Sequence, residues 1–354
     1  MFNIQLKHLL TLPATAIIIS SCNNNDDPSD IGTYDFSPIL NHVSENVITA
    51  TYGDLHSKSQ SLITAVENFN ADRSSTNLEA ARQAWRDCRI PWEQSEGFLF
   101  GPVSTEGIDP AIDSWPVNVI DLDAVLASGE SLTKAYVDAL EGTLKGFHTI
   151  EYLLWGTDGD KSAAAFTDRE FEYLSAVTQS LEGATQQLYD AWHSGGDNFQ
   201  LNIAQAGTAT SIYPSQKSAM QELVNGMIGI ADEVANGKIN EPLTNMDVTL
   251  EESHFSSNSK ADFMDNIRSI KNVYLGSYLM DGEGISDYIK SLNSSVDDDV
   301  IAHIDAAILA IENIPGDFSD AIFTNTTSVE AAQQSVRDLQ SILESAVKPL
   351  IDNY

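Results

Sequence analysis

Two residues able to bind a metal ion lie three positions apart near the middle of the chain. The run Gly146–Gly156 reads GFHTIEYLLWG and places His148 and Glu151 in an otherwise apolar stretch that suits a helix. Residues three apart share one helical face, with Cβ atoms roughly 5–6 Å apart, so both side chains can reach one small ion. A histidine nitrogen and a carboxylate oxygen are common ligands of borderline divalent metals. The alternative is a His–Glu hydrogen bond on a half-buried helix. The apolar neighbours favour a pair within the packed interior.

A second polar set lies upstream. Glu96 follows Arg89 by seven residues, two helical turns along one face, and Trp85 and Trp92 lie near that face. A carboxylate near an arginine indicates either a buried ion pair or a site in which the arginine orients a ligand carboxylate. The irregular segment that follows contains Asp113, which would bring another carboxylate into the same space.

Charge and length restrict the functions that this chain can have. The 354 residues carry a net charge of −34, which disfavours nucleic acid and anionic membrane surfaces because the chain would repel both. We therefore expect no nucleic-acid partner. Most of the 52 acidic residues fit a solvated surface, so charge alone proves no metal site. The length exceeds what one core usually supports, which favours two domains.

The amino terminus indicates export. The apolar stretch Leu9–Ile19 is too short to span a bilayer but suits the core of a signal peptide, and it ends in Ile19-Ser20-Ser21-Cys22, which resembles the lipobox of bacterial lipoproteins. We predict a signal peptide over residues 1–21, a lipid on Cys22 and a flexible tether over residues 22–35. The protein would then be anchored to a bacterial membrane, on the outer membrane, its periplasmic face or the cell surface. The alternative is an unprocessed leader followed by a chance cysteine.

The rest of the chain predicts helices throughout. Apolar residues recur at three- and four-residue spacing in eight segments, and no alternation typical of a sheet is present. This predicts an all-α fold with two similar four-helix bundles packed side by side, over residues 36–195 and 196–354. Ser74 and Ser215 are predicted helix caps. The eight predicted helices are Leu55–Phe69, Leu78–Glu96, Ser131–Leu154, Arg169–Trp192, Gln216–Asn236, Ser259–Leu279, Ile301–Ile311 and Val329–Ile351.

These residues carry a family resemblance. Gly146-x-His148-x-x-Glu151 resembles the signature of the imelysin-like proteins, once classified as peptidases (M75-type). The similarity extends over nearly everything from about Tyr34 onward. Its other parts are the segment from Trp85 to Gly101, the loop Ile112-Asp113-x-Trp115-Pro116, and Glu252-Ser253-x-x-Ser256 with Asp262 and Asn266.

The resemblance implies two similar four-helix bundles with a functional site where they meet. It also implies an exported or lipoprotein component of bacterial iron acquisition, whose partners would be a metal ion or metal chelate and membrane iron-transport components. Carried over by position, the expected metal ligands are His148, Glu151, Glu96 and Asp113. The expected ligand-orienting residues are Arg89, Trp115, Ser253 and Ser256.

The peptidase label of the family agrees poorly with the signature. The zincin motif supplies two histidines one turn apart with a glutamate base between them, whereas this signature has one histidine, with Thr149 and Ile150 in the intervening positions. One imidazole with several carboxylates suits iron, calcium or manganese at least as well as zinc. We therefore predict binding of a divalent or ferric ion (iron, zinc or calcium) for iron uptake. The alternatives are a zinc metallopeptidase, if Glu96 supplies the base, and a glycan-binding or other lipoprotein without metal that uses its tryptophans as platforms.

Overall fold

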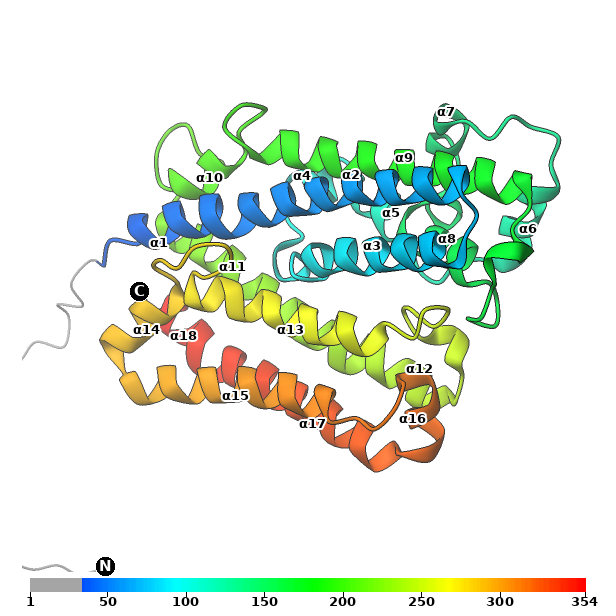
Figure 1. Ribbon diagram of the computed structural model, residues 1–354. Helices are drawn as coiled ribbons and strands as arrows, with labels where there is room; N and C mark the ends of the chain where they lie inside the picture. Colours follow the sequence, from blue (N-terminus) through cyan, green and yellow to red (C-terminus); the bar gives the residue numbers. More distant parts are fainter. Residues whose placement is uncertain (1–33) are drawn as a thin grey trace, which may run out of the picture. The chain divides into compact units, whose positions relative to one another are not determined.

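The computed structural model of the protein describes residues 34–354, of which Asp35–Tyr354 form one compact unit. The predicted all-α fold is confirmed: the described residues contain helices and a single isolated bridge between Ser277 and Asp281 (Figure 1). The predicted signal peptide (1–21), the lipidation residue Cys22 and all but the last two residues of the tether (22–35) lie outside the described residues. Within residues 34–354, no helix is both long and apolar enough to cross a membrane.

Four helices form a first helix group. They are α2 (Ala50–Ala71), α3 (Ser75–Glu93), α8 (Gly146–Trp155) and α9 (Asp168–Trp192). Helix α2 packs against α3 and α9, and α8 packs against the same two helices. Figure 1 shows this group in the upper half of the view.

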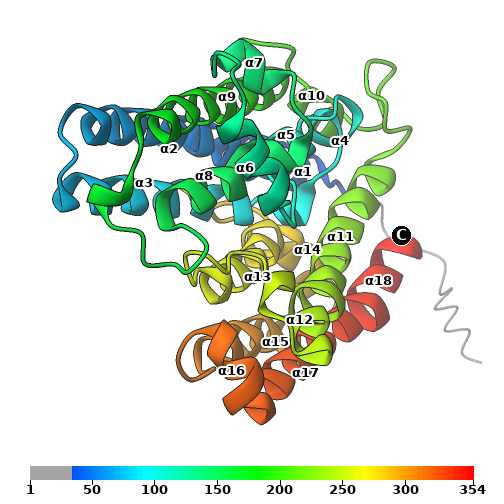
Figure 2. The same ribbon diagram turned by 90° about the vertical axis from the view of Figure 1, so that its right-hand side faces the viewer.

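A second helix group lies below the first in Figure 1. It consists of α11 (Gln216–Asp232), α13 (Ser259–Leu275), α15 (Ser294–Glu312) and α17 (Thr326–Ile342). Helix α15 packs against α13 and α17, and α11 packs against the same two. The groups meet where α13 contacts α3, as the end-on view in Figure 2 also shows. The predicted domain boundary at residue 195 stays a prediction.

Shorter elements complete the chain. Among residues 34–354, three π-helical segments continue longer helices without a break: Val43–Thr49, Glu233–Ile239 and Leu343–Val347. The short α-helices are α1 (Ser37–His42), α4 (Pro102–Thr105), α5 (Asp109–Ile112), α6 (Val119–Ala127), α7 (Lys134–Asp138), α10 (Gln200–Ala204), α12 (Asn240–Asn245), α14 (Ile285–Leu292), α16 (Phe318–Thr324) and α18 (Lys348–Asp352). The 3₁₀ turns are Glu96–Phe98, Gly142–Leu144, Ala163–Ala165 and Val248–Leu250.

The helices begin where the sequence supplies caps. The Ser74 hydroxyl accepts the backbone N–H of Asn77 at the start of α3, and Ser215 accepts that of Ser218 at the start of α11. Both predicted caps are confirmed, and each satisfies a backbone donor that the first helical turn leaves without a partner.

The predicted helix Ser131–Leu154 is wrong in its first half. The segment divides into α7, a 3₁₀ turn and α8, which begins at Gly146 with a φ of +78°. A Cβ at Gly146 would lie 2.3 Å from the carbonyl oxygen of Ile112, so a side chain there is excluded. The break lets the segment that carries Asp113 pack directly against the start of the signature helix, and periodicity alone does not reveal such a contact.

The predicted helix Leu78–Glu96 ends earlier than expected. Helix α3 ends at Glu93, and Glu96 begins the 3₁₀ turn that follows. Glu96 is therefore not two helical turns from Arg89 on the same face. The position one turn after Arg89 belongs to Glu93, whose side chain is fully buried. Helix α13 also ends earlier than predicted. It stops at Leu275 because Gly276 adopts the left-handed conformation, so the predicted extension to Leu279 is wrong.

Candidate functional site

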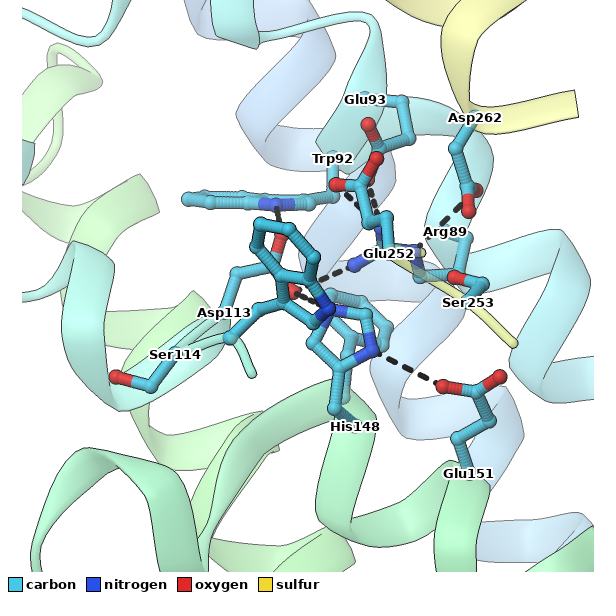
Figure 3. Close-up of polar contacts among 12 residues, drawn as sticks. Arg89, Trp92, Glu93, Asp113, Ser114, His148, Glu151, Glu252, Ser253 and Asp262 are labelled. Carbon is cyan, nitrogen blue, oxygen red and sulfur yellow. Dashed lines mark hydrogen bonds and ion pairs between the residues drawn. The ribbon is translucent and has the colours of Figure 1, made fainter. Parts of the chain in front are cut away.

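The fully buried guanidinium of Arg89 lies at the centre of a charged cluster between the two helix groups (Figure 3). Its Nη1 is 2.6 Å from Asp113 Oδ1, its Nη2 is 3.3 Å from Glu252 Oε1, and its Nε is 3.4 Å from Asp262 Oδ1. Nη2 also contacts Glu93. Arg89 and Glu93 come from α3, whereas Glu252 and Asp262 come from the second half of the chain. One buried cation thus holds both halves together.

Asp113 is the carboxylate that the loop after α5 brings to this cluster. Its Oδ2 accepts the indole N–H of Trp92 at 2.5 Å, while its Oδ1 contacts both Arg89 and His148. Burial alone would raise the pKa of Asp113, but the cations Arg89 and His148 hold it well below its usual range. Asp113 is therefore a permanent anion in this site.

His148 lies between two carboxylates at the start of α8. Its Nδ1 is 3.0 Å from Glu151 Oε2, and its Nε2 is 3.0 Å from Asp113 Oδ1 (Figure 3). The other oxygen of Glu151 accepts two hydrogen bonds from Ser256, at 2.8 Å from the backbone N–H and 2.7 Å from the hydroxyl. Because Ser256 fixes the carboxylate, Glu151 fixes the orientation of the imidazole ring.

The two ring nitrogens of His148 are not equivalent. The contact of Nδ1 with Glu151 meets hydrogen-bond geometry, whereas Nε2 makes no aligned hydrogen bond despite its closeness to Asp113. Burial lowers the pKa of His148, but Asp113 and Glu151 more than offset this effect and raise it to about 9. Without another cation, the ring is protonated at neutral pH.

Lys238 forms a second centre next to the first. Its Nζ is 2.6 Å from Glu96 Oε2, 2.8 Å from Glu252 Oε1 and 3.7 Å from Glu93 Oε2. The amide N–H of Asn266 joins Glu93 and Glu96 at 2.6 and 3.0 Å. Burial raises the pKa of both Glu93 and Glu96 well above the usual value, and the neighbouring Glu252 adds to this shift. We call Lys238, Glu93 and Glu96 the lysine cluster.

The whole site has an excess of negative groups. Burial and the Glu252 charge raise the pKa of Asp262 to about 6 although Arg89 opposes them, and burial raises the pKa of Glu251 to about 7. Buried carboxylates are tolerated when protons or cations compensate them, and burial is the largest cause of both shifts. The cations in contact are Arg89, Lys238 and His148, and the carboxyl groups that they contact are Glu93, Glu96, Asp113, Glu151, Glu252 and Asp262.

The arrangement of donor atoms fits a metal ion. Asp113, His148 and Glu252 each offer an atom within 4.8 Å of the other two, and we call this set the histidine cluster. The second set, Glu93, Glu96, Asp113 and Glu252, shares two members with it. Two ligands about 2.1 Å from one ion lie about 3.0–3.4 Å apart at usual coordination angles, which fits the 3.0 Å between His148 Nε2 and Asp113 Oδ1. His148 Nε2 and Glu252 Oε2 are buried without hydrogen-bond partners.

The structure brings together most of the residues that the sequence singled out. His148, Glu151, Asp113, Arg89 and Ser256 are linked by the contacts above. Glu96 lies in the lysine cluster, outside the set that contains His148. Trp115 and Ser253 support the backbone of the segment that carries Glu252: the Trp115 indole donates to the Glu251 carbonyl at 3.0 Å, and the Ser253 N–H donates to Ser259 at 3.0 Å.

Lys238 and Glu93 belong to the site but were not predicted from the sequence. Glu93 follows Arg89 by four residues, which is the spacing of a helical ion pair. The sequence therefore contained this pair, but Glu96 was predicted as the carboxylate near Arg89. Lys238 lies in the π-helical segment Glu233–Ile239, and no pattern in the sequence distinguishes it from a surface lysine. Three tryptophans considered as glycan platforms, Trp85, Trp92 and Trp155, are buried and offer no surface for a ligand.

Among the described residues, a buried cluster of a histidine and several carboxylates thus lies between two groups of packed helices. The imelysin family model (peptidase M75) matches residues 48–345, and the chain belongs to this family. The predicted family resemblance is therefore confirmed. The iron-regulated protein A of Synechococcus elongatus is 32% identical over 234 residues, which are 66% of this chain and 62% of that relative, so the match spans less than two thirds of its length.

Solved structures agree with the family assignment. An iron-regulated protein A precursor from Parabacteroides distasonis superposes with a TM-score of 0.82 at 29% identity, over 89% of this chain and 95% of the other. An imelysin-like protein from Psychrobacter arcticum has a TM-score of 0.72 at 14% identity, over 88% of this chain and 94% of that one, and this likeness concerns the fold alone.

Proposed function

We propose that this protein is an exported, lipid-anchored metal-binding component of bacterial iron acquisition, with its metal site at the histidine cluster. His148 Nε2, Asp113 and Glu252 would hold the ion. Glu151 would orient His148, and Arg89 would compensate the remaining carboxylates. When bound, the ion would supply the positive charge that the cluster lacks.

The observation that carries the proposal is the state of the His148 ring. The Nδ1 N–H donates to Glu151, so a neutral ring keeps its proton on Nδ1, and Nε2, 3.0 Å from Asp113, is the nitrogen that can bind a metal ion once it has lost its own proton. A carboxylate that holds the far nitrogen of a histidine in this way is the usual outer partner of a metal-bound imidazole. His148 Nε2 and one Glu252 oxygen are buried without hydrogen bonds, which costs desolvation free energy. A purely structural ion-pair network would gain nothing that offsets this cost.

The assignment to iron rests on two further points. The Synechococcus and Parabacteroides relatives are both named iron-regulated proteins. One imidazole with two carboxylates is an oxygen-rich set that suits ferrous or ferric iron, although zinc and calcium remain competitors to be tested. Neither group of potential ligands contains a second histidine, so the paired histidines of a zincin are not found among the described residues.

Calorimetric titration of the purified mature protein with ferrous, ferric, zinc and calcium ions tests the proposal. We expect saturable binding of iron at micromolar affinity or tighter, loss of binding in His148→Ala, and a rise in the melting temperature of the wild type alone when iron is added. His303→Ala is the matched control, because His303 bonds only a nearby backbone carbonyl on α15. A wild type that binds none of the four ions would overturn the proposal.

The anchoring part is tested separately. Labelled fatty acid should incorporate into the wild type, and Cys22→Ala should move the protein from the membrane to the soluble fraction or stall its processing. Unlabelled wild-type protein would contradict the anchor and leave the metal site untouched.

A further inference from the structure

A pocket of about 350 Å³ opens beside the lysine cluster. Its lining includes Glu96, Glu222 and Glu233, together with Asn225, Gly229 and Ile230. The charged groups among the described lining residues are all carboxylic, and the nearby Lys348 ammonium donates to the lining residue Asn225 at 2.5 Å, so the lining itself attracts cations while Lys348 offsets part of its charge. We call it the acidic pocket.

The acidic pocket is connected to the histidine cluster through two hydrogen bonds. Glu96 belongs to the pocket lining and accepts the Lys238 ammonium at 2.6 Å, and the same ammonium donates to Glu252 at 2.8 Å. Glu252 belongs to the histidine cluster. Two buried oxygens without hydrogen-bond partners border this path: Oε2 of Glu252, and Oδ1 of Asn266, whose amide N–H bonds Glu96 at 3.0 Å.

We propose that a metal ion reaches the histidine cluster through the acidic pocket, and that the Lys238 ammonium closes this route until the arriving ion displaces it. The inference rests on the proposed metal-binding function. Lys238 occupies the place where oxygens of Glu93, Glu96 and Glu252 converge, so one cation would exchange for another. The carboxylates stay compensated throughout, which avoids the high cost of buried unpaired charge.

The π-helical segment links the pocket to the lysine cluster. Segment Glu233–Ile239 contributes Glu233 to the pocket and Lys238 to the cluster. Such π-helical turns frequently occur at functional sites, where the widened backbone places one side chain outside the regular α-helical register. Movement of the Lys238 side chain towards Glu233 would open the path without changes in α11 or α13.

Gly229 provides a way to close the pocket. A Cβ built at this position has no heavy atom within 4 Å, so a side chain can begin there without displacing the backbone. The variant Gly229→Leu should therefore fold normally and block the route. Gly129→Leu is the matched control, since a Cβ at Gly129 also meets nothing within 4 Å and Gly129 is not part of the pocket lining.

Stopped-flow mixing with ferrous iron under anaerobic conditions, read by tryptophan fluorescence, tests the route. In Gly229→Leu we expect association and dissociation rates both to fall by about tenfold, with an unchanged equilibrium constant, whereas Gly129→Leu keeps wild-type rates. Unchanged rates in Gly229→Leu, or a change confined to the dissociation rate, would overturn the route. If the wild type itself binds no ion in the titration above, the proposed function fails instead, so the two failures are distinguishable.

The charge of the pocket is tested with a second variant. Glu222→Gln/Glu233→Gln should lower the association rate severalfold at low salt, and the difference from wild type should vanish at high salt because salt screens electrostatic attraction. Glu312→Gln/Glu330→Gln removes the same charge from exposed positions on α15 and α17. Equal effects from the two double variants would show that general surface charge, and not the pocket, attracts the ion.

Discussion

The histidine cluster and the lysine cluster are adjacent sets of carboxyl groups with different cations. In the lysine cluster, the Lys238 ammonium lies 2.6 Å from Glu96 and 2.8 Å from Glu252, so the chain supplies its own cation. In the histidine cluster, Glu151 fixes the ring while Nε2 is left without an aligned hydrogen bond. The chain thus compensates the carboxylates of one side of this buried acidic site with its own ammonium, and on the other side it leaves one ring nitrogen without an aligned partner.

Arg89 supports both clusters, and its loss should have the largest effect. We expect Arg89→Met to lower the free energy of unfolding by about 3–5 kcal/mol, because removing one partner leaves buried carboxylates without their cation. Arg89 contacts four of these groups, three from outside its own helix. Urea denaturation followed by circular dichroism measures the change.

The control for Arg89 is an arginine that has a single ion pair and whose own side chain is exposed. Arg268 bonds Asp265 at 2.9 Å with 41% of its side chain exposed, so Arg268→Met should change stability by less than about 1 kcal/mol. Similar losses in the two variants would mean that the central position of Arg89 confers no special stability.

Lys238→Met tests the lysine cluster alone. We expect a loss somewhat smaller than that of Arg89→Met, about 2–3 kcal/mol, because Glu93 and Glu96, whose pKa values burial already raises, can take up protons. Added divalent cations should restore more stability to this variant than to the wild type, since they can replace the ammonium. Lys271→Met, which removes an exposed pair with Asp305, is the control. A variant indifferent to cations would mean that only an ammonium fits there.

Glu151→Gln tests the histidine cluster. Ser256 donates two hydrogen bonds to one carboxyl oxygen, so the amide oxygen of a glutamine must occupy that place and the NH₂ group must face His148 Nδ1. Nδ1 then has to accept a hydrogen bond, which moves the ring proton to Nε2 and blocks the metal. We expect iron affinity to fall about 10–100-fold, as measured by calorimetry.

Two comparisons make the Glu151 result specific. Ser256→Ala removes one of the two bonds to Glu151 and should weaken iron binding only severalfold, while Glu312→Gln at an exposed position should have no effect. If Ser256→Ala and Glu151→Gln were equally harmless, the orientation of His148 would not control the site.

The sequence predicts the helices and the central pair well, because both depend on local spacing. His148 and Glu151 meet since residues three apart share a helical face. The regular spacing of apolar residues likewise predicts the long helices that form the two groups. The predicted all-α fold therefore follows from patterns within single segments.

The rest of the site depends on contacts between distant segments. Asp113 reaches His148 because α8 begins at Gly146, where a side chain would strike the Ile112 carbonyl. The three-residue difference between Glu93 and Glu96 decided which carboxylate pairs with Arg89, and helix ends are the least predictable part of a helix. Lys238 had no local signal, since its partners are 14 to 145 residues away in the sequence.

The pH dependence of iron binding gives the most specific effect. Because the pKa of His148 is raised to about 9, iron must displace one proton from Nε2 at neutral pH. We expect iron affinity to rise by about tenfold per pH unit up to pH 9 and then to level off.

The stability of the metal-free fold should respond to pH in the opposite direction. A raised histidine pKa stabilises the fold fully below pH 6.5, and this contribution disappears as pH rises from 6.5 to about 9. The wild type should thus lose its stability advantage over His148→Ala across this window. Subtracting the free energy of unfolding of the variant from that of the wild type cancels the contribution of the other buried carboxyl groups, because they titrate in both proteins. Parallel curves for both proteins would mean that the Asp113 and Glu151 contacts do not hold a charged ring.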